Sequence, residues 1–482
     1  MYRQALFNIL PDLLQPLRSL HSERQIAESK PNMPNRLCYA LAFLAILALG
    51  CGKQRLQTGV VVIGAGISGI AAAEHLKSRG VDVLVLEARD RVGGRIHSLT
   101  SETGHVFEIG AGWIEGTEEN PLVGLAEKLN LPTQSDDGEN TIWFDAAGRK
   151  MPADATEKIG SHFEGWVSHL ETLRATQRTD VPLETALESY AAAAEMDNEA
   201  KTGLHFSLAT EIEADYAGDR SELSLQHFDS DRGRGDESLI VPDGYDQIVK
   251  RLASKLDIRL KERVRVIDSR RDGISVETEN LKVEAQQAIV TVPLGVLQAG
   301  TIRFRPELPE RKRRAMQALK MGTLHRTYFI FKEAFWSEGV HTFYHVGAWP
   351  AFINMQFYNG QPALLAFHGG KAGRRLDAMG DAEIGREGMA ILRKLFGEKI
   401  PEPAQVIASH WEQDSLSRGT YSFIPVGATP SDYDAMAEPV GGKLYFAGEA
   451  TNRKDPATVH GAYLSGKREG RRILREHYRD RK

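Results

Sequence analysis

The chain has 482 residues, of which 41% are hydrophobic and 26% charged, and its formal net charge is −5. These values are typical of a soluble globular protein with room for two domains, and they give no reason to expect nucleic-acid binding. No group of His, Cys and Asp residues has the spacing of metal ligands, so no metal site is predicted. The basic run Arg311–Arg314 is interpreted as a solvated helix face.

Residues 1–56 are predicted to be a leader before the folded body. The apolar run Leu37–Leu49 is shorter than the about 20 residues that a membrane-spanning helix needs, and it suits the apolar region of a secretory signal. It ends in Leu-Gly-Cys51, which resembles a bacterial lipoprotein cleavage site. We expect an exported protein, periplasmic or anchored to the membrane by a lipid on Cys51. An ordinary signal peptide, an uncleaved anchor and cytoplasmic residence are the alternatives.

The folded body begins with a strand, a glycine turn, a helix and a second strand. The apolar run Val60–Ile63 leads into Gly64–Gly69, a helix pattern follows, and Val81–Leu86 ends in Glu87. The three glycines permit a tight turn, close approach of a pyrophosphate and close packing of helix on strand. The helix start offers N–H groups to phosphates, and Glu87 is placed to accept ribose hydroxyls. This unit predicts dinucleotide binding.

The residues that follow Glu87 distinguish FAD binding from NAD binding. Ala88–Arg95 reads Ala-Arg-Asp-Arg-Val-Gly-Gly-Arg and adds donors that suit the same pyrophosphate. This run is typical of flavoproteins of the glutathione-reductase-like superfamily and favours FAD. The two cysteines, Cys38 and Cys51, both lie in the predicted leader, so a non-covalent flavin is expected.

The remaining elements alternate between two predicted domains. A FAD-binding domain is assigned to residues 57–116, 236–299 and 406–482, and a substrate-binding domain to 117–235 and 300–405. Among the predicted strands are Ile258–Ile267 and Ala351–Tyr358, and a helix is predicted over Asp381–Phe396. Thr458 is a candidate N-cap for a closing helix whose positive end would face a flavin.

Six motifs in order resemble those of the flavin-dependent amine oxidase family, and among its branches they are most similar to polyamine oxidases. Beside Gly64–Gly69 and Glu87–Arg95, the others are Gly110–Gly116, Val290–Leu297, Trp411 to Tyr421, and Phe446–Glu449 with Pro456–Gly461. The resemblance implies an α/β, glutathione-reductase-like two-domain FAD fold: a Rossmann-type FAD domain and a discontinuous α+β substrate domain.

The resemblance also implies site residues. Glu115, Asp215 and Tyr421 correspond to substrate-binding positions, with Tyr421 one wall of an aromatic cage. Tyr421 and Arg326 are the candidate catalytic residues, and Arg326 stands where the family has a lysine. The implied FAD-binding residues are Gly64, Gly66, Ser68, Gly69, Glu87, Ala88, Arg89, Gly94, Arg95, Gly110, Ala111, Gly112, Trp113, Val264 (through its backbone), Trp411, Gly448, Glu449, Thr458 and Val459.

The function implied is oxidation of an amine, with a polyamine as substrate. Hydride passes from the α-carbon to flavin N5, the imine hydrolyses to an aldehyde and an amine, and O2 becomes H2O2. Because arginine replaces the lysine at Arg326, another electron acceptor stays open. The alternatives are a desaturase or porphyrinogen-type oxidase with an apolar substrate, and a weakly or non-catalytic flavoprotein. A histone demethylase is disfavoured by the predicted leader and by the lack of a long coiled-coil insertion.

Overall fold

The computed structural model describes residues 53–478, except 102, 103, 137, 139 and 232. Cys38 and Cys51 lie outside these residues, so the export signal and the lipid anchor stay predictions. Strand β1 (Gln54–Ile63) includes the last three residues of the predicted leader, 54–56. No helix of the described part is long and apolar enough to cross a membrane.

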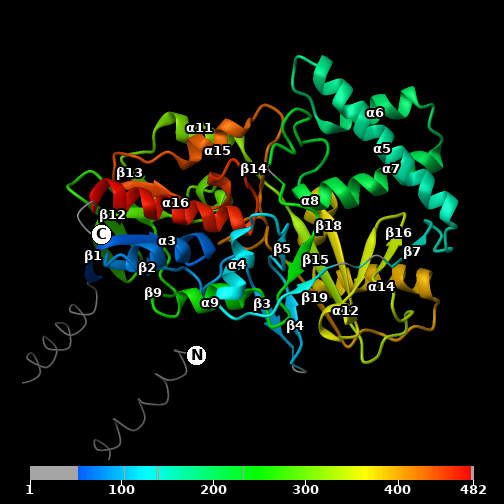
Figure 1. Cartoon of the computed structure of the whole chain (residues 1–482), viewed down its shortest axis with the longest axis horizontal. Coiled ribbons are helices and arrows are strands. Elements are labelled where there is room, and N and C mark those ends of the chain that lie inside the picture. The colour runs from blue at the N-terminus through cyan, green and yellow to red at the C-terminus, as the bar shows by residue number, and fades with distance from the viewer. Residues whose placement is uncertain (1–52, 102–103, 137, 139, 232, 479–482) are drawn as a thin grey trace, which may run out of the picture. The chain divides into compact units, whose positions relative to one another are not determined.

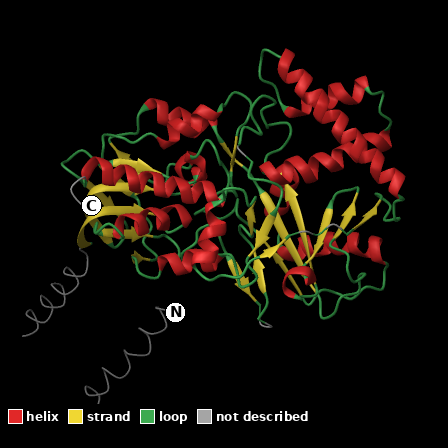
Figure 2. Ribbon diagram, viewed as in Figure 1, coloured by secondary structure: helices red, strands yellow, loops and turns green. Residues whose placement is uncertain are grey.

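The strands gather in two main groups, which Figure 2 shows in yellow. The first is an eight-stranded sheet in the order β13-β10-β11-β12-β1-β2-β9. The eighth strand, β21, pairs with the end of β12, further along β12 than the part that pairs with β11. Its strands besides β1 are β2 (Val83–Leu86), β9 (Asp257–Arg259), β10 (Val266–Asp268), β11 (Ile274–Glu277), β12 (Leu281–Val290), β13 (Arg303–Arg305) and β21 (Leu444–Phe446).

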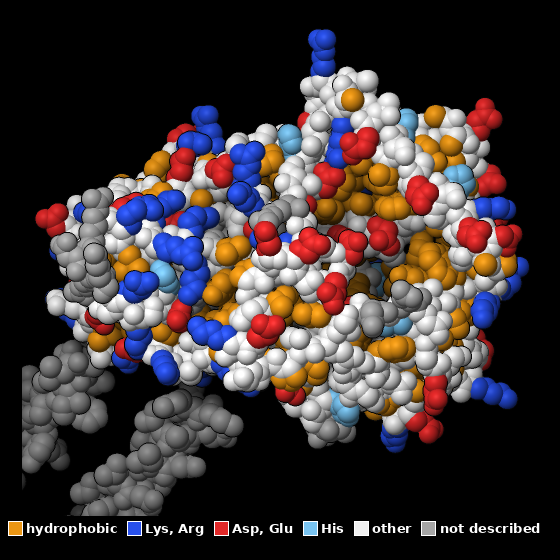
Figure 3. All heavy atoms as spheres, viewed as in Figure 1, with side chains coloured by type: hydrophobic (Ala, Val, Ile, Leu, Met, Phe, Trp, Pro, Cys, Tyr) orange, Lys and Arg blue, Asp and Glu red, His pale blue; other side chains and the backbone are white. Residues whose placement is uncertain are grey.

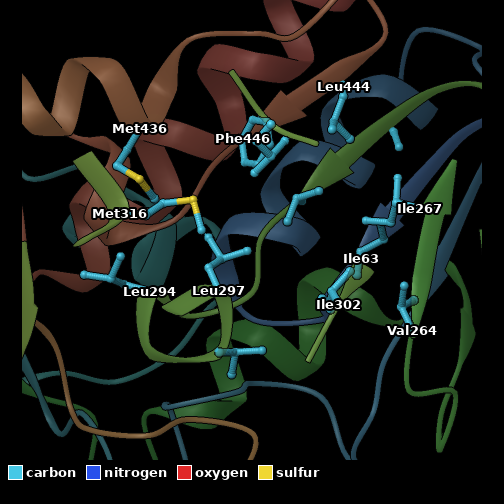
Figure 4. Close-up of a cluster of buried hydrophobic side chains, with 14 of the residues drawn as sticks. Ile63, Val264, Ile267, Leu294, Leu297, Ile302, Met316, Met436, Leu444 and Phe446 are labelled. Carbon is cyan, nitrogen blue, oxygen red and sulfur yellow. The ribbon is translucent and has the colours of Figure 1, made fainter. Parts of the chain in front are cut away.

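The last four residues of strand β1, Val60–Ile63, are buried on both faces of this sheet. Val60 and Val62 belong to one apolar cluster, and Val61 and Ile63 belong to another, because successive side chains of a strand point to opposite faces. Figure 4 shows Ile63 in the second cluster, with Leu444 and Phe446 of β21. A strand segment that is covered on both faces is expected to have a continuous apolar sequence, as Val60–Ile63 has.

The parallel strands at the centre of the sheet end at one edge. Ile63 of β1 pairs with Leu86 of β2 and with Val290 of β12, which in turn pairs with Phe446 of β21. The residues that follow these strands therefore meet outside their carboxyl ends, where open α/β sheets bind ligands.

Helices cover this sheet and surround the second one (Figure 1). α3 follows β1, and α16, which ends the described chain, packs against α3. The helices are α3 (Ile67–Lys77), α4 (Pro121–Lys128), α5 (Ala153–Thr176), α6 (Leu183–Ala193), α7 (Asn198–Leu208), α8 (Ala214–Tyr216), α9 (Asp246–Ala253), α10 (Leu294–Gln298), α11 (Glu310–Ala318), α12 (Gln356–Asn359), α13 (Gly370–Asp377), α14 (Asp381–Phe396), α15 (Pro430–Ala437) and α16 (Val459–His477).

The second sheet has six strands in the order β19-β15-β18-β17-β16-β7. These are β7 (Thr141–Phe144), β15 (Leu324–Ile330), β16 (Thr342–His345), β17 (Ala351–Asn354), β18 (Ala363–Gly369) and β19 (Gln405–Ala408). Smaller sheets join β3 (Ser98–Thr100) to β4 (Val106–Glu108), β5 (Trp113–Glu115) and β6 (Gln134–Ser135) to β8 (Ser238–Ile240), and β14 (Lys320–Met321) to β20 (Ser422–Phe423). The predicted domain limits stay a prediction. The two main sheets draw on the predicted blocks except at two strands: β13 belongs to the first sheet although it lies within 300–405, and β19 belongs to the second although most of it lies within 406–482.

Three sequence interpretations are wrong. Ile258–Ile267 is two separate strands, β9 and β10, and Ala351–Tyr358 is a strand only to Asn354, where α12 follows. Within Arg311–Arg314, Lys312 is 1% exposed rather than solvated. Its ammonium donates to the carbonyls of Ala435 and Met436 at the end of α15, and burial lowers the pKa of Lys312 to about 7.

Candidate functional site

The glycine turn after β1 has the close contacts that its sequence predicts. Gly64 has a φ of 109° and donates its N–H to the Leu86 carbonyl. A Cβ on Gly69 would lie 2.0 Å from the Gly64 carbonyl oxygen, so only glycine lets α3 start this close to the strand. These two glycines shape the turn without lining a cavity.

A first cavity opens beside this turn, at the carboxyl ends of the strands. The predicted residues that line it are Gly66, Ser68, Glu87, Arg89, Gly94, Arg95, Gly110, Ala111, Trp411, Gly448, Glu449, Thr458 and Val459. Further residues that line it have no role predicted from the sequence. Among them, Leu324 and Ala462 lie outside the quoted motifs, and five lie inside them: Thr291, Leu416, Ser417, Thr420 and Ala457.

Glu87 is fixed at this cavity by backbone hydrogen bonds. Its side chain accepts the N–H of Ala65 at 2.7 Å and the N–H of Arg89 at 2.8 Å, and the residue is 6% exposed. The two bonds hold the carboxylate at the strand end, where the sequence places a ribose acceptor.

Charged groups pair across the cavity wall. Arg95 donates to the Glu449 carboxylate at 2.9 Å and to the Thr420 carbonyl at 2.6 Å. Arg89 pairs with Asp414, and its guanidinium lies 5.9 Å from the ring centre of Trp411. The Trp411 indole N–H donates to the Ile109 carbonyl at 2.6 Å, which orients the ring.

The residues present fit FAD. A Cβ on Gly66 would meet only the Gly93 carbonyl oxygen, at 4.0 Å, and one on Gly448 would meet no atom within 4 Å, so both glycines leave open space for a ligand. Helices α3 and α16 each begin at this cavity. Thr458 accepts the N–H of Gly461, whereas Val459 and His460, in the first turn of α16, have N–H groups without a partner in the described chain. Two helix starts with free N–H groups suit the electronegative groups of FAD.

Four further predicted FAD-binding residues lie outside this cavity lining. Val264 is 5% exposed and packs in the apolar cluster of Figure 4, and Ala88 lies beyond the strand end. Gly112 packs against Glu108 and Arg326, since a Cβ there would lie 3.1 Å from the Arg326 Nη1. Trp113 faces a different cavity.

This second cavity has a volume of about 580 Å³ and meets the first. Residues that line both are Glu115, Leu324, Arg326, Tyr421, Ala457 and Thr458. Asp215 lies in the second cavity alone, and the Tyr421 hydroxyl donates at 2.8 Å to the Ala214 carbonyl beside it. The structure thus brings together the four residues that the resemblance assigns to substrate and catalysis.

Arg326 lies against two neighbouring aromatic rings at the junction of the cavities. Its guanidinium carbon lies 5.0 Å from the ring centre of Trp113 and 5.1 Å from that of Phe367. Its Nη1 donates to the Glu108 carbonyl at 2.9 Å, and the residue is 7% exposed. A fixed positive charge therefore stands at the junction.

The second cavity is acidic. Burial, followed by the charges of Glu115 and Glu211, raises the pKa of Asp215 to about 7. Desolvation by the surrounding cavity walls also raises the pKa of the Glu115 carboxyl, and the charges of His460 and Arg326 oppose this rise. Glu115 is exposed to the space of the cavity, and its carboxylate has no hydrogen-bond partner in the described part of the chain. On the face seen in Figure 3, acidic side chains gather in a row beside hydrophobic ones.

Sequence reasoning missed several residues of this cavity. Asp136, Asp231, Asp455 and His460 also line it. His460 belongs to a quoted motif, which is a signal that could have singled it out, whereas Asp136 and Asp231 carry no local pattern.

The fold and the first cavity suit a flavoprotein, and an acidic cavity adjoins the cavity that fits the cofactor. Residues 67–474 match the family model described as "Flavin containing amine oxidoreductase". The chain belongs to this family of flavin-containing amine oxidoreductases, whose members carry the flavin that the first cavity fits.

The relatives of the chain include histone demethylases and a polyamine oxidase. The chain is 36% identical to lysine-specific histone demethylase 1 homolog 1 of Arabidopsis thaliana, over 86% of this chain and 52% of that protein. It is 32% identical to polyamine oxidase 2 of Arabidopsis thaliana, over 91% and 92%. The chain thus spans about half the length of the demethylase relatives it matches. A solved putrescine oxidase with putrescine bound shares the fold, with a TM-score of 0.72 and 23% identity over 88% of this chain and all of that one.

Proposed function

We propose that the protein is a FAD-dependent amine oxidase that acts on polyamines, with FAD held non-covalently. The observation that carries this proposal is the meeting of the two cavities at Glu115 and Tyr421, with Asp215 further out. Two carboxylates along one cavity suit a substrate with several ammonium groups. The polyamine oxidase relative, matched over nearly its whole length, supports the same substrate class.

Each residue that lines the second cavity or its junction with the first has a separate role in this proposal. Glu115 and Asp215 bind ammonium groups, and Tyr421 presents its ring where the amine passes from one cavity to the other. The hydrogen bond from Tyr421 to the Ala214 carbonyl fixes that ring. Arg326 keeps a positive charge at the junction, where its contacts with Trp113 and Phe367 and its hydrogen bond to the Glu108 carbonyl hold the guanidinium in place. FAD supplies the two-electron oxidation of the C–N bond when bound, with O2 or another acceptor taking the electrons.

A second candidate substrate is a methylated lysine side chain in a peptide. The demethylase relatives favour it, and an acidic cavity suits a basic peptide as well. A polyamine carries several ammonium groups in one small molecule, whereas a methylated lysine is a single amine within a peptide. Comparing small amines with such a peptide therefore distinguishes the two candidates.

The pKa of Asp215 predicts how polyamine use depends on pH. Its carboxyl has a folded-state pKa raised to about 7, so it is neutral below that pH and anionic above it. The ratio of kcat/KM for spermidine to kcat/KM for a monoamine is therefore expected to rise as the pH increases through about 7. The ratio cancels titrations that affect both substrates alike.

Asp215→Asn is the matched variant for this measurement, because it removes the titrating group at constant size. Its ratio is expected to rise less steeply than that of wild type between pH 6 and 8, about one unit on each side of the Asp215 pKa, because only the other carboxyls of the cavity still titrate. A wild-type ratio that does not change with pH, or one that rises as steeply in Asp215→Asn, contradicts the role given to Asp215.

A further inference from the structure

Arg234 joins three segments that face the two cavities. It precedes Gly235 in the polar loop that follows Asp229, and it is 7% exposed. Its Nε donates to the Asp455 carboxylate at 2.8 Å, and its Nη2 lies 2.6 Å from the same oxygen. Both side chains of this pair are 5% exposed, so the ion pair is buried.

Arg234 also clamps the segment that presents Glu115. Its Nη1 donates to the Glu119 carbonyl at 2.5 Å, and its own carbonyl accepts the N–H of Glu118 at 2.9 Å. Gly116 has a φ of 68°, and a Cβ there would lie 2.4 Å from the Arg234 carbonyl oxygen. The loop and the Glu115 segment are therefore in direct backbone contact.

Asp455 links Arg234 to the start of helix α16. The Thr458 hydroxyl donates to the Asp455 carbonyl at 3.0 Å, and the same hydroxyl oxygen accepts the N–H of Gly461. The His460 Nε2 lies 3.6 Å from the Asp455 carboxylate. The buried pair thus leads to the first turn of α16, which lines the first cavity.

We propose that Arg234 is a positioning residue whose ion pair with Asp455 sets the first turn of α16 against the Glu115 segment. The proposal rests on the proposed function, since the first cavity is taken to bind FAD. Removing one partner of a buried ion pair leaves the other charge uncompensated, so the segments it joins shift or loosen. The expected consequence is weaker FAD binding, because α16 starts at that cavity.

The test is the dissociation constant of FAD, measured by flavin fluorescence with the full chain. Arg234→Gln is expected to raise it about tenfold or more. Arg234→Lys, which keeps the charge but not the fork of donors, is expected to fall between Arg234→Gln and wild type. The matched control is Arg174→Gln: Arg174 pairs with Asp229 at 2.6 and 2.9 Å and holds the other end of the same loop, away from α16.

The control is expected to bind FAD within about twofold of wild type, even where it lowers the melting temperature. Asp455→Asn removes the other charge at constant size and must weaken FAD binding as Arg234→Gln does. If Arg234→Gln does not fold, Asp455→Asn is the variant that tests the proposal. Wild-type FAD affinity in the decisive variant, or an equal loss in Arg174→Gln, overturns the proposal. Because this assay needs no amine, its failure is distinct from a failure of the proposed substrate.

Discussion

A Glu87→Ala variant is expected to bind FAD about a hundredfold more weakly than wild type. The substitution removes the acceptor placed for the ribose and leaves the N–H groups of Ala65 and Arg89 without their partner. A hydrogen bond to a charged group contributes about 1.5–3 kcal/mol, and 1.4 kcal/mol corresponds to a factor of ten in affinity. Two hydrogen bonds from the carboxylate to ribose hydroxyls would therefore account for a loss of about a hundredfold.

The measurement is a titration of the apoprotein with FAD, followed by flavin fluorescence. Glu74→Ala is the control, because Glu74 lies on α3 of the same strand–helix–strand unit and pairs with Lys467 outside the first cavity. It is expected to keep wild-type affinity. Glu87→Ala with unchanged FAD affinity would show that the first cavity does not bind the adenosine half as proposed.

Glu115→Gln is expected to raise the KM for spermidine and spermine by about 10- to 100-fold while changing a monoamine little. Glu115 lines both cavities, and its carboxylate has no other partner in the described chain, so its charge is available to an ammonium group. A charge-assisted hydrogen bond contributes about 1.5–3 kcal/mol. Glutamine keeps the size and one acceptor but removes the charge.

Steady-state kinetics with a polyamine and a monoamine, run side by side, measure this difference. Glu118→Gln is the control, because Glu118 is exposed on the same segment and lines neither cavity. It is expected to leave both substrates unchanged. An equal loss for polyamine and monoamine in Glu115→Gln would contradict charge recognition and point to a general disturbance of the junction.

Local patterns predicted the first strand, the glycine turn, the helix and the position of Glu87 at a strand end. The run Val60–Ile63, the glycine turn and Glu87 follow each other in sequence, and each has a local physical cause: burial on both faces, backbone freedom and a strand end. The helix predicted over Asp381–Phe396 has those same limits in the structure, because its apolar residues recur with helical spacing and Gly397 ends it.

The second cavity could not be predicted in this way. Its residues come from segments that are distant in sequence, such as Arg234 and Asp455, which are 221 positions apart. The burial of Lys312 depends on the end of α15, more than a hundred positions later. Only the family resemblance placed Glu115, Asp215, Arg326 and Tyr421 together, and it gave no indication of Asp231 or of the pair at Arg234.

The most direct test of the account is anaerobic mixing of the FAD-loaded protein with single amines, followed by the absorbance of oxidised flavin. The series comprises spermidine, spermine, putrescine, a monoamine and a peptide with methylated lysine. Loss of absorbance with the polyamines, and slower or no loss with the monoamine and the peptide, is the predicted result. Loss with the peptide alone would favour the second candidate substrate, and unchanged absorbance with every amine would contradict the proposed function.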